Sequence, residues 1–360
     1  MALNILHVID TTGPGGAETV FLDLAQETMR RGHKSIALIR GPGWVQDQLK
    51  KRGIAYEVCD CKGSLNVRFL VFLVSVIRRH GITHIQSHLL GSNVYTSLVG
   101  LLLRIPVVNT FHGHVDISKK ERFRNIKLAI VRAGARHVVS VTDELKHSIN
   151  RTTRGWSHLN AAVIPNGIDV TKLEKLPIKP FDENSGRMVF GCLGNIRPAK
   201  NYSLAVEFIA LLQRKGVDVE LRVAGDDTKP EAQALKEYAL TCGVGKKVQF
   251  LGFIDDVCAF LSDIDVFLMT SSSEGHPLAL TQALAAGLPV ISTRNGVEKI
   301  VPEEFMFLAH DQTPESLEVA RTKLLITEDL NKIRVKARVY VLNHYSLDSM
   351  FSRYFQLYEV

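Results

Sequence analysis

A repeated alternation of short apolar runs and segments with helical periodicity constrains the fold of this chain more than any other feature. Residues 4–9 and 35–39 form apolar runs of strand length, and residues 17–31 place apolar side chains at helical spacing. Further strands are expected at 82–86, 106–110, 138–141 and 163–164, and further helices at 67–79 and 94–103. This alternation predicts an α/β domain with a doubly wound parallel sheet that is covered on both faces.

The alternation stops in a polar stretch that is rich in proline and glycine, and then begins again. Residues 171–187 contain Pro177 and Pro180 and carry no periodic apolar pattern. Beyond them, strands are expected at 189–193, 220–224, 248–251, 266–269 and 290–292, and helices at 203–214, 231–242 and 278–286. A chain of 360 residues is also too long for one ordinary core. The sequence therefore predicts two Rossmann-like domains, 1–170 and 188–345, joined by a linker at 171–187.

The C-terminal segment 346–360 is expected to form a separate helix. Its apolar residues fall on one side at helical spacing, namely Met350, Phe351, Tyr354, Phe355 and Tyr358. Because such a stripe is normally buried, we expect this helix to pack back toward the N-terminal domain.

The composition is that of a globular protein rather than a membrane-spanning or disulfide-stapled one. The longest apolar stretch, residues 69–77, is about half of the roughly 20 residues that a spanning helix needs. Residues 1–4 lack the basic start of a signal peptide. The five cysteines are scattered and odd in number. We therefore expect a cytoplasmic protein in a reducing compartment, with neither a disulfide framework nor a zinc site.

Positive charge is concentrated in the first half of the chain. Residues 1–180 carry 25 Lys and Arg against 13 Asp and Glu, a balance of +12, whereas residues 181–360 carry 19 against 24, a balance of −5. This asymmetry favours an anionic partner for the first half alone. Segment 119–127 interleaves cations with Phe123 and Ile126, as expected of a helix that lies on an anionic membrane surface. Solvated helix faces are the alternative, and no recognition motif supports a nucleic-acid partner.

Ligands of open α/β sheets bind beyond the carboxyl ends of the strands. The first turn of this kind, residues 13–16, is rich in glycine and can bring backbone amides close to a polar ligand. However, Glu18 stands where a dinucleotide fingerprint has its third glycine, and the second strand ends in Arg40 rather than an acid. A nicotinamide cofactor is therefore not expected.

A second turn, residues 194–201, contains two cations between a predicted strand and a predicted helix. Arg197 offers a bidentate fork and Lys200 a point charge, so the pair is well placed to neutralise a diphosphate. Two solvated surface cations are the alternative interpretation.

Two motifs that resemble metal sites are interpreted otherwise. Asp263 and Asp265 spell a DxD pattern, but they lead directly into a buried strand, where a role in a turn is expected. His84 and His88 are four residues apart, yet they straddle the end of a predicted strand, so the spacing does not place them on one face. No metal site is predicted. His112 directly follows a strand, and we expect it to contact a polar ligand.

The segment 271–293 contains the strongest local signal of a ligand site. After the strand at 266–269, Glu274 closes a turn and Pro277 suits the first position of the next helix. Free N–H groups at a helix start attract anions, whereas a carboxylate accepts hydrogen bonds from hydroxyl groups. A phosphate next to a sugar satisfies both demands, so the segment predicts a nucleoside diphosphate sugar as the ligand.

In their order and spacing, these motifs resemble those of the family 4 retaining glycosyltransferases. The resemblance covers nearly the whole chain. It rests on Gly15-Gly16-Ala17-Glu18, Arg31-Gly32-His33, His112-Gly113, residues 163–169 (VIPNGID), residues 194–201, Glu274-Gly275-His276-Pro277-Leu278 and residues 285–290 (AAGLPV). The fold that it implies is GT-B, in which two Rossmann-like domains face a central cleft.

The resemblance implies roles in donor binding. Glu274 matches a glutamate that, together with nearby backbone amides, grips the hydroxyl groups of the donor sugar. Lys200 matches the lysine that binds the diphosphate. Gly15 and Gly16 match a loop that closes over the phosphates, and His112 matches a histidine beside the donor sugar. The donor-binding motif also includes Gly275, His276, Pro277 and Leu278.

Two positions depart from the family pattern. Gln282 stands where the family usually has a second glutamate, which holds the nucleotide ribose, and Asn195 stands where an arginine is common. Arg197, two residues on, is the expected replacement for that arginine. A glutamine can accept a hydrogen bond from one ribose hydroxyl and donate to the other, so we expect Gln282 to keep a weaker grip.

The resemblance also implies a reaction. Enzymes of this type work without a metal, a cofactor or a protein nucleophile, and the protein supplies positioning and charge stabilisation. The expected substrates are a nucleotide sugar donor and a polysaccharide or lipid-linked glycan acceptor, with the protein at the inner face of a membrane. The alternatives are a nucleotide-sugar epimerase of the same fold and a non-catalytic nucleotide-sugar-binding subunit.

Overall fold

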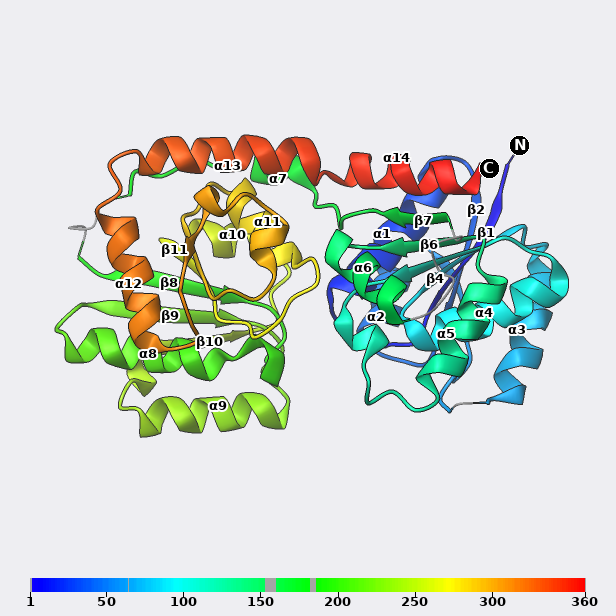
Figure 1. Ribbon diagram of the computed structural model, residues 1–360, viewed down its shortest axis with the longest axis horizontal. Helices are drawn as coiled ribbons and strands as arrows, with labels where there is room; N and C mark the ends of the chain where they lie inside the picture. Colours follow the sequence, from blue (N-terminus) through cyan, green and yellow to red (C-terminus); the bar gives the residue numbers. More distant parts are fainter. Residues whose placement is uncertain (1, 64, 153–159, 182–185, 360) are drawn as a thin grey trace. The chain divides into compact units, whose positions relative to one another are not determined.

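The chain divides into two compact units, each with its own sheet (Figure 1). Unit 1 comprises residues 1–166 and 348–360, and unit 2 comprises residues 167–347. The C-terminal segment thus belongs to the same unit as the N-terminal half. The structure is a computed structural model that describes all residues except 1, 64, 153–159, 182–185 and 360.

Unit 1 contains a seven-stranded parallel sheet with the strand order β3-β2-β1-β4-β5-β6-β7. Its strands are β1 (Asn4–Ile9), β2 (Lys34–Ile39), β3 (Ala55–Val58), β4 (His84–His88), β5 (Val107–Phe111), β6 (His137–Ser140) and β7 (Asn160–Val163). Its helices are α1 (Gly16–Arg30), α2 (Trp44–Lys51), α3 (Val67–His80), α4 (Leu90–Leu103), the 3-10 turn η1 (His114–Ile117), α5 (Arg124–Gly134), α6 (Asp143–Thr152) and α14 (Leu347–Tyr358). The strand order reverses between β1 and β4, which confirms the predicted doubly wound architecture.

Unit 2 contains a six-stranded parallel sheet with the strand order β10-β9-β8-β11-β12-β13. Its strands are β8 (Met188–Leu193), β9 (Val219–Ala224), β10 (Val248–Gly252), β11 (Val266–Met269), β12 (Val290–Ser292) and β13 (Phe307–Leu308). Its main helices are α7 (Val170–Leu173), α8 (Tyr202–Arg214), α9 (Pro230–Thr241), α10 (Val257–Ser262), α11 (Leu278–Ala285), α12 (Pro314–Leu325) and α13 (Leu330–His344). The order reverses between β8 and β11, so the second doubly wound sheet is confirmed as well.

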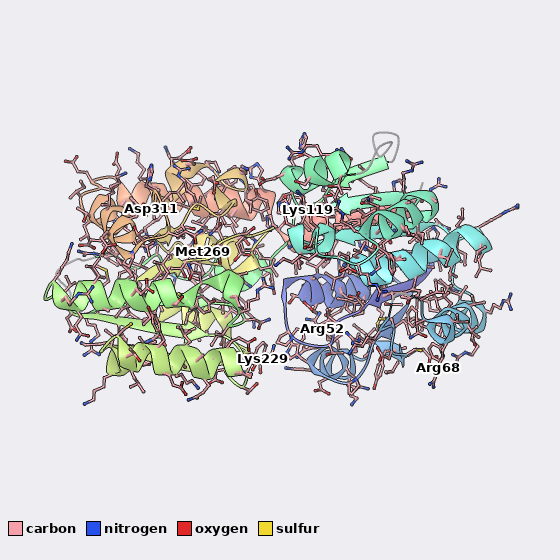
Figure 2. All side chains as sticks on the ribbon, turned by 60° about the horizontal axis from the view of Figure 1, so that its bottom comes forward. Arg52, Arg68, Lys119, Lys229, Met269 and Asp311 are labelled. Carbon is pink, nitrogen blue, oxygen red and sulfur yellow. The ribbon has the colours of Figure 1, made fainter. Side chains whose placement is uncertain are left out.

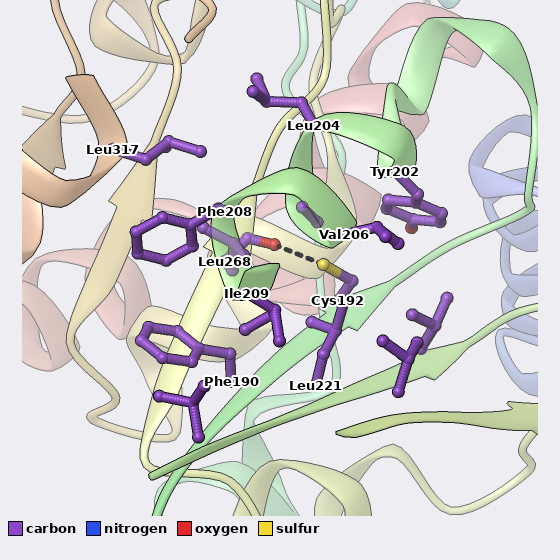
Figure 3. Close-up of a cluster of buried hydrophobic side chains, with 14 of the residues drawn as sticks. Phe190, Cys192, Tyr202, Leu204, Val206, Phe208, Ile209, Leu221, Leu268 and Leu317 are labelled. Carbon is purple, nitrogen blue, oxygen red and sulfur yellow. Dashed lines mark hydrogen bonds between the residues drawn. The ribbon is translucent and has the colours of Figure 1, made fainter. Parts of the chain in front are cut away.

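The core of unit 2 packs α8 against the sheet (Figure 3). Phe190 of β8 and Phe208 of α8 are fully buried and meet edge to face, with ring centroids 5.4 Å apart. The thiol of Cys192 donates a hydrogen bond to the carbonyl oxygen of Leu268 at 3.2 Å (Figure 3). Burial raises the pKa of this thiol to about 12. Cys192 is therefore a packing residue rather than a nucleophile.

Helix α14 buries the apolar stripe of the C-terminal segment within unit 1. All five residues of the stripe are buried, namely Met350, Phe351, Tyr354, Phe355 and Tyr358. Two of them also reach strands of the sheet through their hydroxyl groups. The Tyr354 hydroxyl lies 3.1 Å from Oγ1 of Thr110, and the Tyr358 hydroxyl donates to Oε1 of Gln86 at 2.9 Å.

Strand β4 lies two residues later than the sequence predicts. It pairs with β1 in a register that sets Ile5 against His84 and Ile9 against His88. Both histidines therefore lie within one strand, and the prediction that they straddle its end is wrong. The register also places Gln86 on the same face as the two histidines, since side chains alternate along a strand.

The segment 119–127 is not one helix, contrary to the prediction. Helix α5 begins only at Arg124, because Phe123 adopts a left-handed backbone conformation, with a φ of 57°, at the N-cap. Lys119 lies on the exposed surface of unit 1 (Figure 2). No helix within the described residues combines the length and the apolar character that crossing a bilayer requires.

Other elements of the fold give only a weak periodic signal in the sequence. The elements that the sequence analysis missed are α2, β3, α5, α6, α7, α10, β13, α12 and α13. Helix α2 is short and buries Val45 and Leu49. Helix α13 places Arg334 on its buried face, where the guanidinium donates to the carbonyl oxygen of Gly287 at 2.6 Å. A buried arginine interrupts the apolar pattern from which a helix is predicted.

Candidate active site

Hydrogen bonds join two turns at the carboxyl edge of the unit 2 sheet. The first turn follows β8 and the second follows β11, which are neighbouring strands. The Thr270 hydroxyl donates to the carbonyl oxygen of Lys200 at 3.0 Å. The amide of Ser272 donates to the carbonyl oxygen of Ala199 at 2.9 Å. The two segments predicted to bind a diphosphate and a sugar thus form one surface.

Lys200 and Glu274 form an ion pair across these two turns. Nζ of Lys200 lies 2.7 Å from Oε1 of Glu274, and the two side chains are 11% and 7% exposed. The Ser271 hydroxyl donates to the same carboxylate oxygen at 2.5 Å. Within the described residues nothing hydrogen-bonds to Oε2 of Glu274. The sequence assigned these two side chains to different parts of a ligand, and the structure shows that they also bind each other.

The backbone of the first turn makes room for Lys200. Gly194 has a φ of 140°, and a Cβ there would lie 3.0 Å from Cε and 3.4 Å from Nζ of Lys200. A side chain at this position would therefore displace the lysine from the end of β8. Asn195 is half-buried and Arg197 is exposed. Lys200 is thus the fixed cation of this turn, and Arg197 is the solvent-accessible one.

The second turn leads directly into α11. The amide of Glu274 donates to the carbonyl oxygen of Asn295 at 2.9 Å, which holds the turn against the end of β12. Pro277 is the N-cap of α11 and not its first helical residue as predicted, because its ψ of 114° is extended. Across the described part of the chain, no side chain caps this helix start. Amides of the first turn, beginning at Leu278, are therefore oriented to meet an anion.

The remaining residues of this segment differ in burial. His276 is 5% exposed and meets the ring of Tyr345 edge to face, with ring centroids 4.9 Å apart. Burial lowers the pKa of His276 to about 4, so the imidazole is neutral at neutral pH. Gly275 and Gln282 are half-buried. The His276 ring therefore packs against Tyr345, whereas Gln282 keeps a partly accessible side chain on α11. A role of either residue in donor binding stays a prediction.

The predicted residues of unit 1 lie at the carboxyl edge of its own sheet. Gly15 and Gly16 start α1 after β1, and His112 directly follows β5. A Cβ at Gly15 would lie 2.3 Å from Oε2 of Glu18. A side chain there would push the Glu18 carboxylate away from the helix start.

His112 belongs to a buried polar cluster that the sequence did not predict. Its Nε2 lies 2.9 Å from Nδ1 of His88, and the two rings stack with centroids 5.2 Å apart. Asp116 Oδ2 accepts hydrogen bonds from the amides of His112 and Gly113 at 2.7 and 3.3 Å. Burial lowers the pKa of His112 to about 3 and raises the pKa of Asp116 to about 7. The available sequence signal was the run of polar residues in β4, which is unusual for a buried strand.

The DxD motif has a structural role. Oδ2 of Asp265 accepts a hydrogen bond from the amide of Val189 at 2.8 Å, which joins the starts of β11 and β8. Asp263 ends α10 as its C-cap. Among the described residues, no group of three or more His, Cys, Asp or Glu side chains is arranged to hold a metal ion.

Two family models match the chain, one in each half. The model described as Glycosyltransferase Family 4 matches residues 14–172. The model described as Glycosyl transferases group 1 matches residues 177–338. Together they include every residue discussed above as a candidate for donor binding.

Three relatives match most of this chain. EpsF of Bacillus subtilis is 24% identical over 312 residues, which is 82% of this chain and 80% of EpsF. The UDP-Gal:alpha-D-GlcNAc-diphosphoundecaprenol alpha-1,3-galactosyltransferase of Escherichia coli is 23% identical over 258 residues, which is 67% of this chain. That match spans 65% of the galactosyltransferase, slightly less than two thirds of its length. The capsular polysaccharide biosynthesis glycosyltransferase CapH of Staphylococcus aureus is 22% identical over 300 residues, 81% of each chain.

Solved structures share the fold over the full chain. Anabaena HepE in complex with UDP and glucose superposes with a TM-score of 0.83 at 19% identity, over 99% of both chains. A glycosyltransferase from Rickettsia africae superposes with a TM-score of 0.82 at 19% identity, over 99% of this chain and 98% of the other.

Proposed function

Because the chain belongs to glycosyltransferase family 4 and has the GT-B fold, we propose that it is a retaining hexosyltransferase. Its donor is a nucleoside diphosphate sugar, and its acceptor is a polysaccharide or glycolipid intermediate. The observation that carries this proposal is the ion pair of Lys200 and Glu274. It sets a cation suited to a diphosphate directly beside a carboxylate suited to sugar hydroxyls.

When the donor binds, Lys200 and Glu274 give up their contact with each other and bind different parts of the donor. Lys200 and Ser271 both donate to one oxygen of Glu274. A diphosphate carries more negative charge than one carboxylate, so it draws the Lys200 ammonium group toward itself. Glu274 then accepts hydrogen bonds from the sugar hydroxyls in place of that ammonium group. The ion pair holds both side chains near their working positions before the donor arrives.

The transfer step needs no protein nucleophile. The bond between the anomeric carbon and the diphosphate oxygen breaks, and the acceptor oxygen bonds to the same face of that carbon. The leaving diphosphate takes the proton of the acceptor hydroxyl. Lys200, Arg197 and the amides at the start of α11 stabilise the charge that develops on the diphosphate. These groups supply positive charge at the leaving group, which supports a reaction that requires neither a metal ion nor a cofactor.

The relatives narrow the choice of substrates. The E. coli relative is named for a UDP-galactose donor and an acceptor linked to diphosphoundecaprenol. HepE was solved with UDP and glucose. We therefore place UDP-hexoses first among the donors, and polyprenyl-diphosphate-linked glycans first among the acceptors.

Thermal unfolding with a panel of nucleotide sugars tests the donor assignment. A ligand that binds only the folded state at about 100 times its Kd stabilises that state by about 2.7 kcal/mol. A UDP-hexose is expected to raise Tm, and adding the acceptor is expected to give a product that keeps the anomeric configuration of the donor. If every nucleotide sugar leaves Tm unchanged, the proposal is wrong. Conversion of the donor without an acceptor would indicate an epimerase, and binding without transfer to a competent acceptor would indicate a non-catalytic binding protein.

Gln282 is expected to make a modest contribution to donor affinity. A charged hydrogen bond is stronger than a neutral one by roughly 1 kcal/mol, but a glutamate here would also repel the diphosphate. Gln282→Glu should therefore change the donor KM by less than about tenfold. Gln282→Leu should raise KM further, because it leaves ribose hydroxyls without a partner. Steady-state kinetics checks both variants. An inactive wild-type protein whose transfer activity is restored by Gln282→Glu would contradict this interpretation.

We propose that unit 1 contacts an anionic membrane surface from the cytoplasmic side. Phe123 and Ile126 are 52% and 61% exposed at the start of α5. The Arg122 guanidinium lies over the Phe123 ring, 4.8 Å from its centroid, and Lys119 and Lys120 are exposed nearby in sequence. Apolar side chains flanked by cations suit an interface of acyl chains and anionic headgroups.

Vesicle flotation tests this contact. The protein is expected to float with vesicles that contain anionic phosphatidylglycerol at low salt, and to detach as salt screens the attraction. Exchanging both Phe123 and Ile126 for serine should lower the bound fraction severalfold. Val339→Ser is the matched control, since Val339 is 51% exposed on α13 of unit 2. No binding of the wild-type protein at low salt would leave segment 119–127 as a solvated surface.

A further inference from the structure

A chain of buried side chains leads from helix α14 to His112. Tyr358 is 2% exposed, and its hydroxyl group donates to Oε1 of Gln86 at 2.9 Å. Nε2 of Gln86 lies 3.3 Å from Nε2 of His88, and Nδ1 of His88 lies 2.9 Å from Nε2 of His112. Gln86 and His88 are fully buried. Four polar side chains from α14, β4 and the turn after β5 are thus connected end to end.

The orientation of the Gln86 amide decides which atoms donate and which accept in this series of hydrogen bonds. Its nitrogen also lies 3.5 Å from the carbonyl oxygen of Ser87 and 3.0 Å from Oγ1 of Thr110. A carbonyl oxygen only accepts hydrogen bonds, so the amide NH2 and not the amide oxygen must face it. This orientation leaves Oε1 of Gln86 for the Tyr358 hydroxyl. The two N–H groups of the amide are shared among three acceptors, and Nε2 of His88 can only accept from them because an amide NH2 does not accept hydrogen bonds.

The donor and acceptor roles at Gln86 determine which nitrogen carries the proton in His88, and then in His112. A neutral imidazole has one donor nitrogen and one acceptor nitrogen. His88 accepts at Nε2, so its proton is on Nδ1, which donates to Nε2 of His112. His112 therefore carries its proton on Nδ1. Burial lowers the pKa of His88 well below the ordinary value and that of His112 to about 3, so both rings are neutral at neutral pH.

The hydrogen-bond series ends at His112, on the side of the ring away from His88. Nδ1 of His112 is buried and makes no hydrogen bond to any of the described residues. A buried N–H group that lacks an acceptor is unfavourable, so a ligand that brings an acceptor oxygen is bound more tightly there.

We propose that Tyr358, Gln86 and His88 are positioning residues that hold His112 in the Nδ1–H tautomer, so that it donates a hydrogen bond to an oxygen of the donor sugar. The donor sugar as ligand rests on the proposed function, whereas the tautomer does not. In this state His112 is a neutral hydrogen-bond donor at the sugar and not a base. The C-terminal helix, far from His112 in sequence, thereby sets the chemistry of a donor-site residue.

Long-range 1H–15N correlation spectra of the protein labelled with 15N-histidine test the tautomer directly. The His112 signals are identified by their absence from a His112→Gln variant. We expect a neutral ring with the proton on Nδ1 in the free wild-type protein. A proton on Nε2, or a charged ring at pH 7, would overturn the proposal. This measurement needs neither a substrate nor a folded variant of Tyr358, Gln86 or His88.

Removing one hydroxyl group tests the role of α14. Tyr358→Phe deletes the donor to Oε1 of Gln86 and so weakens the preference for the observed amide orientation. The Ser87 carbonyl oxygen still disfavours the turned-over amide, so the Nε2–H tautomer of His112 should appear in part of the molecules. The kcat is expected to fall about three- to tenfold, the factor that corresponds to one neutral hydrogen bond, with nucleoside diphosphate affinity unchanged within about twofold. Tyr354→Phe is the matched control, because Tyr354 is also buried on α14 and its hydroxyl reaches the Gln86 amide only indirectly, through Oγ1 of Thr110. It should keep the wild-type tautomer.

The possible outcomes distinguish a failure of the positioning role of Tyr358, Gln86 and His88 from a failure of the proposed function. An unchanged His112 tautomer in Tyr358→Phe, or the same change in both tyrosine variants, would overturn the role of Tyr358. If the Nδ1–H tautomer is present but no sugar is transferred from any donor, the positioning role is supported and the proposed function is wrong. If sugar transfer occurs and His112 has its proton on Nε2, the proposed function is supported and the positioning role is wrong.

Discussion

Replacing Glu274 with alanine is expected to lower kcat by about 10²–10³-fold, the loss typical of removing one group that stabilises a transition state electrostatically. Glu274 has one carboxylate oxygen bonded to Lys200 and Ser271, and within the described residues its second oxygen has no partner. The variant removes the acceptor for the sugar hydroxyls and leaves the groups that bind the diphosphate. Affinity for the nucleoside diphosphate, measured by calorimetry, should therefore survive while steady-state turnover collapses.

The same variant should also be less stable than the wild-type protein. Glu274 neutralises a nearly buried ammonium group, and removing one partner of a buried ion pair destabilises a protein by about 3–5 kcal/mol. Turnover must therefore be measured where circular dichroism shows a folded protein. Glu303→Ala is the matched control, since Glu303 pairs with Arg294 at 3.0 Å and both side chains are about half exposed. Turnover of Glu274→Ala within a few-fold of the wild type, with the control unchanged, would contradict the role assigned to Glu274.

Lys200→Ala is expected to weaken nucleoside diphosphate binding at least about tenfold. A hydrogen bond from a charged group contributes about 1.5–3 kcal/mol, and the ammonium group of Lys200 is nearly buried at the end of β8. Arg197→Ala should weaken binding less, because Arg197 is exposed and its charge is screened by solvent. Isothermal calorimetry with the nucleoside diphosphate measures both effects.

The control for Lys200 is another lysine of unit 2. Lys332 is 66% exposed at the start of α13, so Lys332→Ala should bind the nucleoside diphosphate like the wild-type protein. The double variant Lys200→Ala/Glu274→Ala should lose less free energy of unfolding than the sum of the losses in the two single variants, because it leaves neither partner unpaired. Unchanged affinity in both Lys200→Ala and Arg197→Ala would mean that residues 194–201 form an ordinary surface loop.

Much of the architecture is determined by the sequence itself. Strands such as β1 and β11, and the start of α11, are predicted at or near their observed bounds because apolar periodicity is a local property of the chain. The turns that carry Lys200 and Glu274 were both predicted to follow strands, at the ends where ligands of such sheets bind. Parallel strands end at one edge of their sheet, so residues that follow such strands meet there whatever their separation in sequence.

The direct contacts among the site residues were decided only by the tertiary structure. Lys200 and Glu274 are 74 residues apart, and their pairing at 2.7 Å depends on the adjacency of β8 and β11. Tyr358 and Gln86 are 272 residues apart, and they meet because α14 packs on the sheet of unit 1. Periodicity reports which side chains are apolar, and it does not identify the partner that satisfies a polar one. Gln86 and His88 are buried polar residues in a strand of which only the first residue is partly exposed, so their roles follow from packing rather than from any local pattern.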